Sequence, residues 1–101
     1  MILIDIKPLS NQQISKEIDG VQYTIAIKNA DGLMVYSIEA DGQILVSNFR
    51  FSKTELMLSY PRLQVNGDFY LTTLDGEAAN YLEFGVTQFL YFLSLDDLEA
   101  M

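Results

Sequence analysis

The 14 aspartate and glutamate residues are the main candidates for chemistry in this sequence, because it contains neither histidine nor cysteine. Ser-His-Asp and Cys-His nucleophiles therefore cannot be assembled, and zinc sites built on histidine or thiolate are excluded. The side chain that most often transfers protons near neutral pH is also missing. Among enzymes, only one that works with carboxylates remains possible.

The densest acidic cluster is Asp96, Asp97 and Glu99. Carboxylates are ligands for Ca²⁺ or Mg²⁺, but this spacing differs from an EF-hand loop and contains no glycine. Four further aspartates are candidates for a catalytic carboxylate pair: Asp19, Asp31, Asp41 and Asp75. Each is already explained as the first residue of an Asp-Gly turn. We therefore predict no catalytic residue, no metal ligand and no cofactor, and an acidic tail that is simply solvated.

The formal charge of −8 is spread unevenly along the chain. Residues 1–67 carry seven acids and all six bases, whereas residues 68–101 carry seven acids and no base. This field repels nucleic acid and anionic membranes, so we expect neither as a direct partner. The acidic third could face a lumen, a basic partner or solvent, and the sequence leaves these alternatives open.

The N-terminal segment does not resemble a targeting signal. Asp5 interrupts its apolar stretch, and no small-residue cleavage site follows. No apolar run reaches the roughly 20 residues of a membrane-spanning helix. We therefore expect the protein to be soluble where it is made.

Glycines divide the chain into short segments. Five of the six follow Asp or Asn, at spacings of 12, 10, 25 and 9 residues. These dipeptides favour two-residue hairpin turns, and such regular spacing is typical of a small all-β protein. The five are Asp19-Gly20, Asp31-Gly32, Asp41-Gly42, Asn66-Gly67 and Asp75-Gly76. We predict a single β domain over residues 1–101, folded as a small antiparallel β-barrel or sandwich.

The segments between these turns alternate in polarity as strands do. The clearest runs from Val21 to Ile27, and the weaker segment 12–18 is predicted as an edge strand because Lys16 shares a face with isoleucines. Residues 43–51 are predicted as a strand with Leu45, Ser47, Phe49 and Phe51 on one face and Ile44, Val46 and Asn48 on the other. Residues 53–60 fit a helical turn or a strand, and we favour a strand or loop that ends at Pro61.

Residues 89–93 form a predicted strand that is apolar on both faces. One face of an antiparallel sheet is normally wet, so either the C-terminal tail or another subunit must cover the second face. We name Phe89, Tyr91 and Phe92 as interface candidates, because aromatic side chains are enriched at interfaces. Arg50 is a fourth candidate, because it could pair with acids of residues 68–101 within or between subunits. The apolar content also favours a homo-oligomer.

The order of several landmarks resembles the small baseplate plug proteins of contractile-tailed bacteriophages. The resemblance covers nearly the whole chain. The landmarks are an opening strand followed by Pro8-Leu9-Ser10-Asn11-Gln12, then Gly20 with Tyr23-Thr24-Ile25, Asp41-Gly42 with Leu45 to Phe51, Gly67-Asp68-Phe69, Phe84-Gly85, and Leu90-Tyr91-Phe92.

This resemblance implies a structural virion component without enzymatic activity, made in the cytoplasm of the bacterial host. It implies a place on the central axis of the tail baseplate, next to the hub and spike or the inner tube. There the protein would close the lumen and be displaced on contraction, with a trimer as the first guess.

Two other functions remain open from the sequence. The first is a soluble β binding module or tail-assembly chaperone that is not retained in the particle. The second is a carboxylate enzyme such as a small glycosidase, which would need a large cleft with two facing acids.

Overall fold

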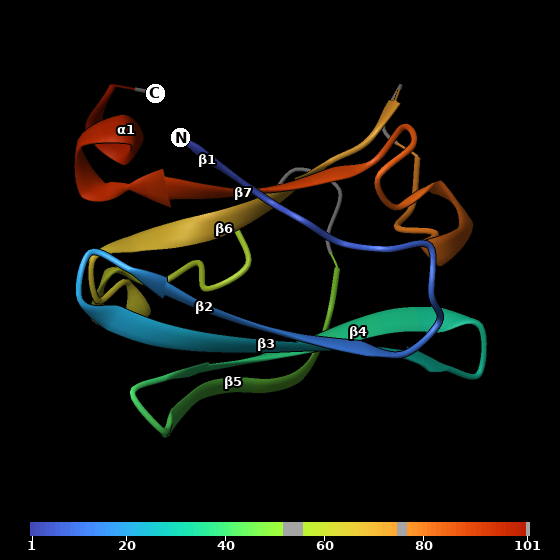
Figure 1. The fold of residues 1–101 in the computed structure, drawn as a ribbon, viewed down its shortest axis with the longest axis horizontal. Helices are drawn as coiled ribbons and strands as arrows, with labels where there is room; N and C mark the ends of the chain where they lie inside the picture. The colour runs from blue at the N-terminus through green and yellow to red at the C-terminus, as the bar shows by residue number, and fades with distance from the viewer. Residues whose placement is uncertain (52–55, 75–76, 101) are drawn as a thin grey trace.

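Two antiparallel sheets face one another in the computed structural model, which describes residues 1–51, 56–74 and 77–100 (Figure 1). One sheet has the strand order β1-β7-β6 and the other β2-β3-β4-β5. The strands are β1 (Ile2–Ile4), β2 (Gln12–Ile18), β3 (Val21–Ala30), β4 (Leu33–Ala40), β5 (Gln43–Arg50), β6 (Gly67–Thr72) and β7 (Phe89–Ser94). Three short helices accompany them in the described residues: η1 (Pro61–Leu63), η3 (Tyr81–Glu83) and α1 (Leu95–Glu99). The predicted all-β class is confirmed, and of its two forms the sandwich is the one observed.

Three of the predicted Asp-Gly turns join the strands of the larger sheet. In Asp19-Gly20, Asp31-Gly32 and Asp41-Gly42 both residues have positive φ, 49–51° for aspartate and 82–86° for glycine. Positive φ at both central residues is the geometry that matches the twist of a hairpin. The prediction for Asn66-Gly67 is wrong, because Gly67 begins β6 instead of turning the chain. Asp75-Gly76 lies outside the described residues.

Strand β5 departs from the predicted alternation. Ile38 of β4 pairs with Val46, but the adjacent Glu39 pairs with Ile44, so β5 contains an extra residue. A second shift follows before Phe49. Phe49 pairs with Tyr36, which shares a face of β4 with Ile38, so Phe49 and Val46 lie on the same face of β5. The prediction that placed Leu45, Ser47, Phe49 and Phe51 on one face opposite Val46 is therefore wrong. Strand β2, by contrast, forms an edge of its sheet as predicted.

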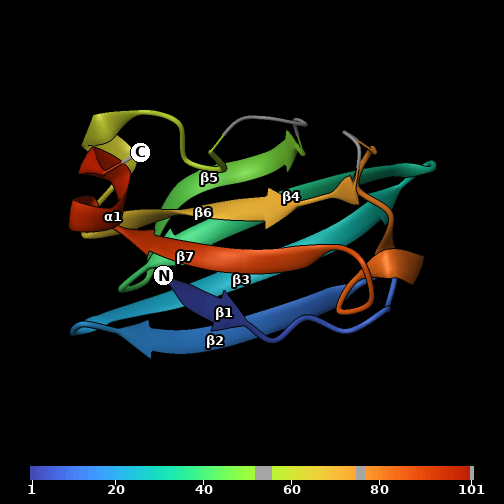
Figure 2. The same ribbon diagram turned by 90° about the horizontal axis from the view of Figure 1, so that it is seen from above.

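The first and last strands of the chain pair with each other. Ile2 lies opposite Phe92 and Ile4 opposite Leu90, so β1 extends the sheet formed by β7 and β6. Figure 2 shows these three strands lying over the four-stranded sheet. Met1 consequently lies beside α1 (Figure 1).

Three aromatic rings from both sheets meet in the core. The Tyr23 ring of β3 lies 5.1 Å from Phe69 and 5.8 Å from Phe92, and the latter two are 5.3 Å apart. Such tilted and edge-to-face pairs each add about 0.5–1.5 kcal/mol beyond simple burial. Phe92 is 1% exposed, so its assignment as an interface candidate is corrected. Its strand is apolar on both faces, and Phe92 lies on the face that packs against the other sheet.

Gly67 allows the core to close at the start of β6. A Cβ atom at this position would lie 2.2 Å from the carbonyl oxygen of Leu93 and 2.5 Å from the Phe92 ring. Its φ angle is not in the left-handed region, so the requirement for glycine here is space. The turn signal that suggested a hairpin therefore has a different cause, which is the close approach of β7.

Asp68 fixes the segment that connects the two sheets. Its side chain is fully buried and accepts hydrogen bonds from the backbone N–H groups of Leu58 (2.8 Å), Ser59 (3.1 Å) and Phe69 (2.6 Å). The Gln64 side-chain amide donates a fourth, at 2.7 Å. A buried carboxylate is tolerated when its oxygens are satisfied in this way. Residues 58–64 are therefore held against the edge of β6.

We expect Gly67→Ala to lower the free energy of unfolding by about 3 kcal/mol or more, because neither a backbone carbonyl nor a packed ring can yield enough space. Gly32→Ala is the matched control. No atom lies within 4 Å of a Cβ there, so only the positive φ penalises alanine, by about 1–2 kcal/mol. Urea unfolding followed by far-UV circular dichroism measures both. Equal losses for the two variants would contradict the steric account of Gly67.

We expect Phe92→Asp to destabilise the fold by at least about 4 kcal/mol, because it places an unpaired charge inside the aromatic core. Tyr91→Asp, one residue away on the opposite face of β7, should cost only about 1–2 kcal/mol. Thermal and urea unfolding of the two variants provide the comparison. A folded Phe92→Asp variant with wild-type stability would show that the core is assigned incorrectly.

Candidate functional site

The other aromatic interface candidates lie on the outer face of the smaller sheet. Phe89 and Tyr91 are half-buried and alternate with the fully buried Leu90 and Phe92. Tyr91 pairs with Leu3 of β1 and with Tyr70 of β6. Cross-strand partners share a face, so these side chains form an apolar strip across all three strands. Together with Phe89 we call Leu3, Tyr70 and Tyr91 the outer strip.

Helix α1 covers only one end of this face. It packs against β6 and β7, and Leu93, which alternates onto the outer face, is 7% exposed. Leu3, at the β1 edge of the outer strip, is 54% exposed. The tail therefore covers part of the second face of β7, and the outer strip remains accessible to a partner.

The acidic residues of α1 differ in their roles. The Asp97 carboxylate accepts a hydrogen bond from Ser94 N–H, while the Ser94 hydroxyl accepts one from Asp97 N–H, both at 3.1 Å. This reciprocal pair is a capping box that starts the helix. Asp97 also lies 2.9 Å from the Met1 amino group, and this hydrogen bond, with that from Ser94, lowers the Asp97 pKa. Asp96 and Glu99 remain exposed.

The predicted absence of a metal site remains a prediction. Within the described residues no three acidic side chains gather in a group that could hold a metal ion. The turn aspartates Asp19, Asp31 and Asp41 each occupy the position in a hairpin that the sequence suggested. Asp41 also accepts a hydrogen bond from Gln22 N–H at 3.0 Å.

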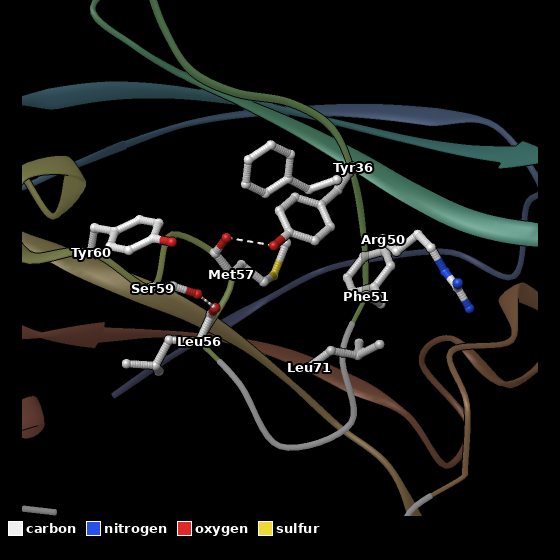
Figure 3. A pocket seen from close by; sticks show the side chains of 9 residues that line it. Tyr36, Arg50, Phe51, Leu56, Met57, Ser59, Tyr60 and Leu71 are labelled. Atoms are coloured by element: carbon white, nitrogen blue, oxygen red, sulfur yellow. Dashed lines mark hydrogen bonds between the residues drawn. The ribbon is translucent and has the colours of Figure 1, made fainter.

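Arg50 ends β5 beside a groove on the flank of the sandwich. Arg50, Phe51 and Leu71 line two adjoining cavities of about 470 and 370 Å³. Figure 3 shows the larger cavity, with the Arg50 guanidinium extending away from Tyr36 and Met57. Its apolar and aromatic walls are Phe49, Phe51, Leu56, Met57, Tyr60 and Leu71. We call these two cavities the Arg50 groove.

One wall of the larger cavity is built from residues 56–60. The Tyr36 hydroxyl donates a hydrogen bond to the Met57 carbonyl, and the Ser59 hydroxyl donates one to the Leu56 carbonyl at 2.6 Å (Figure 3). Met57 N–H in turn donates to the Phe69 carbonyl of β6 at 2.9 Å. Together with the Asp68 contacts, these bonds set the width of the groove. Residues 53–60 were predicted as a strand or loop, and residues 56–60 are irregular, while 52–55 lie outside the described residues.

The wall of the smaller cavity depends on Gln88. Its side chain is fully buried, accepts a hydrogen bond from Asn80 N–H and donates one to the Ala78 carbonyl, both at 2.9 Å. Ala78 and Ala79 line the cavity together with Arg50. Nothing in the sequence pattern indicated that a buried glutamine would hold residues 78–80 in place.

Arg50 supplies the positive charge among the described residues that line the groove. In the part of the chain that the structure describes, the ion pairs are Met1–Asp97 and Lys7–Asp5, so Arg50 pairs with none of the described acids. No described acidic residue lines the larger cavity, and Glu77 lines the smaller one. An apolar groove with a cation at its rim can bind a partner that combines apolar and anionic groups. Among the described residues, the groove offers no pair of facing acids.

Comparison with known proteins identifies a family for the chain. No helix in residues 1–51, 56–74 or 77–100 has the length and apolar character that crossing a membrane requires. A search of curated proteins finds no match. The model of the family described as "Cyanophage baseplate Pam3 plug gp18" matches residues 1–96, which is nearly the whole chain. The chain therefore belongs to this family of phage baseplate plug proteins, which places it in the tail baseplate among other baseplate components.

Proposed function

We propose that this protein is a non-enzymatic plug that closes the lumen of the tail tube at the central axis of the baseplate and is displaced when the tail contracts. The observation that carries the proposal is the family match over residues 1–96. We further propose that its neighbours are the hub, the spike and the inner tube, and that several copies assemble there, with a trimer as the simplest arrangement for a threefold hub.

The surfaces of the monomer support a role in assembly. The outer strip presents Leu3, Phe89 and Tyr91 on a sheet face that α1 covers at one end only. Exposed apolar faces of this kind are typical of protein contacts. The acidic final third supports the proposed position at a lumen, because negative charge discourages DNA from sticking as the genome passes. The lack of histidine and cysteine supports a non-enzymatic role.

The distribution of the protein between extended and contracted tails tests this function. We expect quantitative mass spectrometry to find the chain in purified extended tails and to find it depleted in contracted ones. Electron microscopy of extended tails should show the corresponding density on the baseplate axis. Absence from extended tails would point to an assembly chaperone, and unchanged density after contraction would contradict displacement.

The outer strip can be tested separately in particles. We expect Tyr91→Asp to reduce incorporation into tails by about tenfold, because a charge inside an apolar contact costs about 1.4 kcal/mol or more. Lys28→Asp, at an exposed position of β3, is the control for the added negative charge. Quantitation of the chain in purified tails measures both. Normal incorporation of the Tyr91→Asp variant would exclude the outer strip as an essential contact.

A further inference from the structure

The Arg50 groove has the chemistry to receive an acidic, partly apolar segment. Its larger cavity is walled by aromatic and aliphatic side chains, and Arg50 is its charged member in the described residues. Beside apolar walls, arginine binds a carboxylate better than the strongly hydrated ammonium of lysine does. Its guanidinium is weakly hydrated and donates several hydrogen bonds. A suitable partner therefore carries a carboxylate next to an exposed apolar side chain.

Helix α1 of this same sequence has that combination. Leu95 is 46% exposed, and Asp96 and Glu99 are exposed beside it. Asp97 is already used by the capping box and the Met1 amino group, so Asp96 and Glu99 are the carboxylates left for a partner. The final 34 residues contain no base that would neutralise them. The acid-rich helix and the Arg50 groove are thus complementary in charge and in apolar character.

Within one copy, α1 and the Arg50 groove lie on different parts of the surface. Helix α1 packs against β6 and β7, and none of its residues lines the groove. Figure 2 shows α1 at one end of the sandwich and the end of β5, where Arg50 lies, farther along its flank. Helix α1 of one copy is therefore available to the Arg50 groove of another copy.

We propose that the Arg50 groove of one copy binds α1 of a second copy, with Arg50 pairing with Glu99 or Asp96 and Leu95 entering the aromatic wall. This inference rests on the homo-oligomer in the function proposed above, and it names the contact. Such a contact is heterologous, because one copy contributes its groove and the other contributes its helix α1. Heterologous contacts close into rings when the rotation between copies allows it.

Charge-reversal variants of the purified protein test the contact. We expect sedimentation to show self-association that weakens when NaCl is raised, because salt screens exposed charges. Arg50→Glu should raise the dissociation constant by at least about tenfold, whereas Lys28→Glu, with the same charge change on β3, should not. Adding Glu99→Arg to Arg50→Glu should restore association, and arginine near the C-terminus of α1 also suits the helix dipole.

The absence of cysteine allows a direct measurement of proximity. Ser59→Cys places a thiol in the groove wall and Glu99→Cys places one on α1. We expect a mixture of the two variants to form a disulfide-linked heterodimer under mild oxidation, well above the yield from Lys28→Cys mixed with Glu99→Cys. The cross-link also detects an association too weak to survive sedimentation.

The outcomes separate this inference from the proposed function. A protein that is monomeric by sedimentation at low salt and gives no more heterodimer than the Lys28→Cys control overturns the groove contact. So does association that Arg50→Glu leaves unchanged, because another surface then forms the oligomer. In both cases the distribution of the chain between extended and contracted tails still decides whether it is a plug.

Discussion

The buried Asp68 carboxylate is the interaction on which the arrangement of the two sheets depends. The chain leaves the larger sheet after β5 and must return as β6, the edge strand of the smaller one. Between them, residues 56–60 are irregular, and their backbone N–H groups need hydrogen-bond acceptors from elsewhere in the fold. Asp68 accepts hydrogen bonds from two of these, Leu58 and Ser59, and from the Gln64 side chain. A buried polar group without a hydrogen-bond partner costs about 1–3 kcal/mol of stability. Losing the Asp68 carboxylate would leave several donors without a partner at once.

The hydrogen bonds of Asp68 also link the stability of the fold to the shape of its surface. Residues 56–60 include two of the groups that Asp68 binds and also form a wall of the Arg50 groove. In that wall the Met57 carbonyl accepts a hydrogen bond from the Tyr36 hydroxyl. Gly67 precedes Asp68 and allows β6 to approach the Phe92 ring. Core closure and groove shape therefore originate from neighbouring residues of one short segment. A partner that binds the groove would contact a surface braced from inside the protein.

The parts of the fold that depend on local chemistry could be predicted from the sequence. The Asp-Gly turns at residues 19, 31 and 41 follow from the two residues themselves, because few others accept positive φ in succession. Gly67 was misread because its requirement comes from Leu93 and Phe92, which are distant in sequence. The extra residues of β5 likewise have no local signal.

The candidate site was predictable only in part, for the same physical reason. Arg50 stood out by its charge and its aromatic neighbours, but the groove beside it is made by residues from several separate segments. Phe89, Tyr91 and Phe92 were grouped because they share an apolar strand. The alternation of that strand then separates them, so that Phe92 faces Tyr23 while Tyr91 faces outward. Which face of β7 is inside depends on its packing against the larger sheet, which could not be read from the sequence.

The pairing of β1 with β7 also determines the order in which the protein can fold. The hairpins that join β2 to β5 connect neighbours in sequence, so they can form as soon as those residues leave the ribosome. Ile2, in contrast, must wait for Phe92, its partner at the other end of the chain. The smaller sheet consequently forms after the larger one, once β7 has been synthesised. Until then the inner face of the larger sheet stays uncovered, so the nascent chain is most vulnerable to aggregation before β7 has been made.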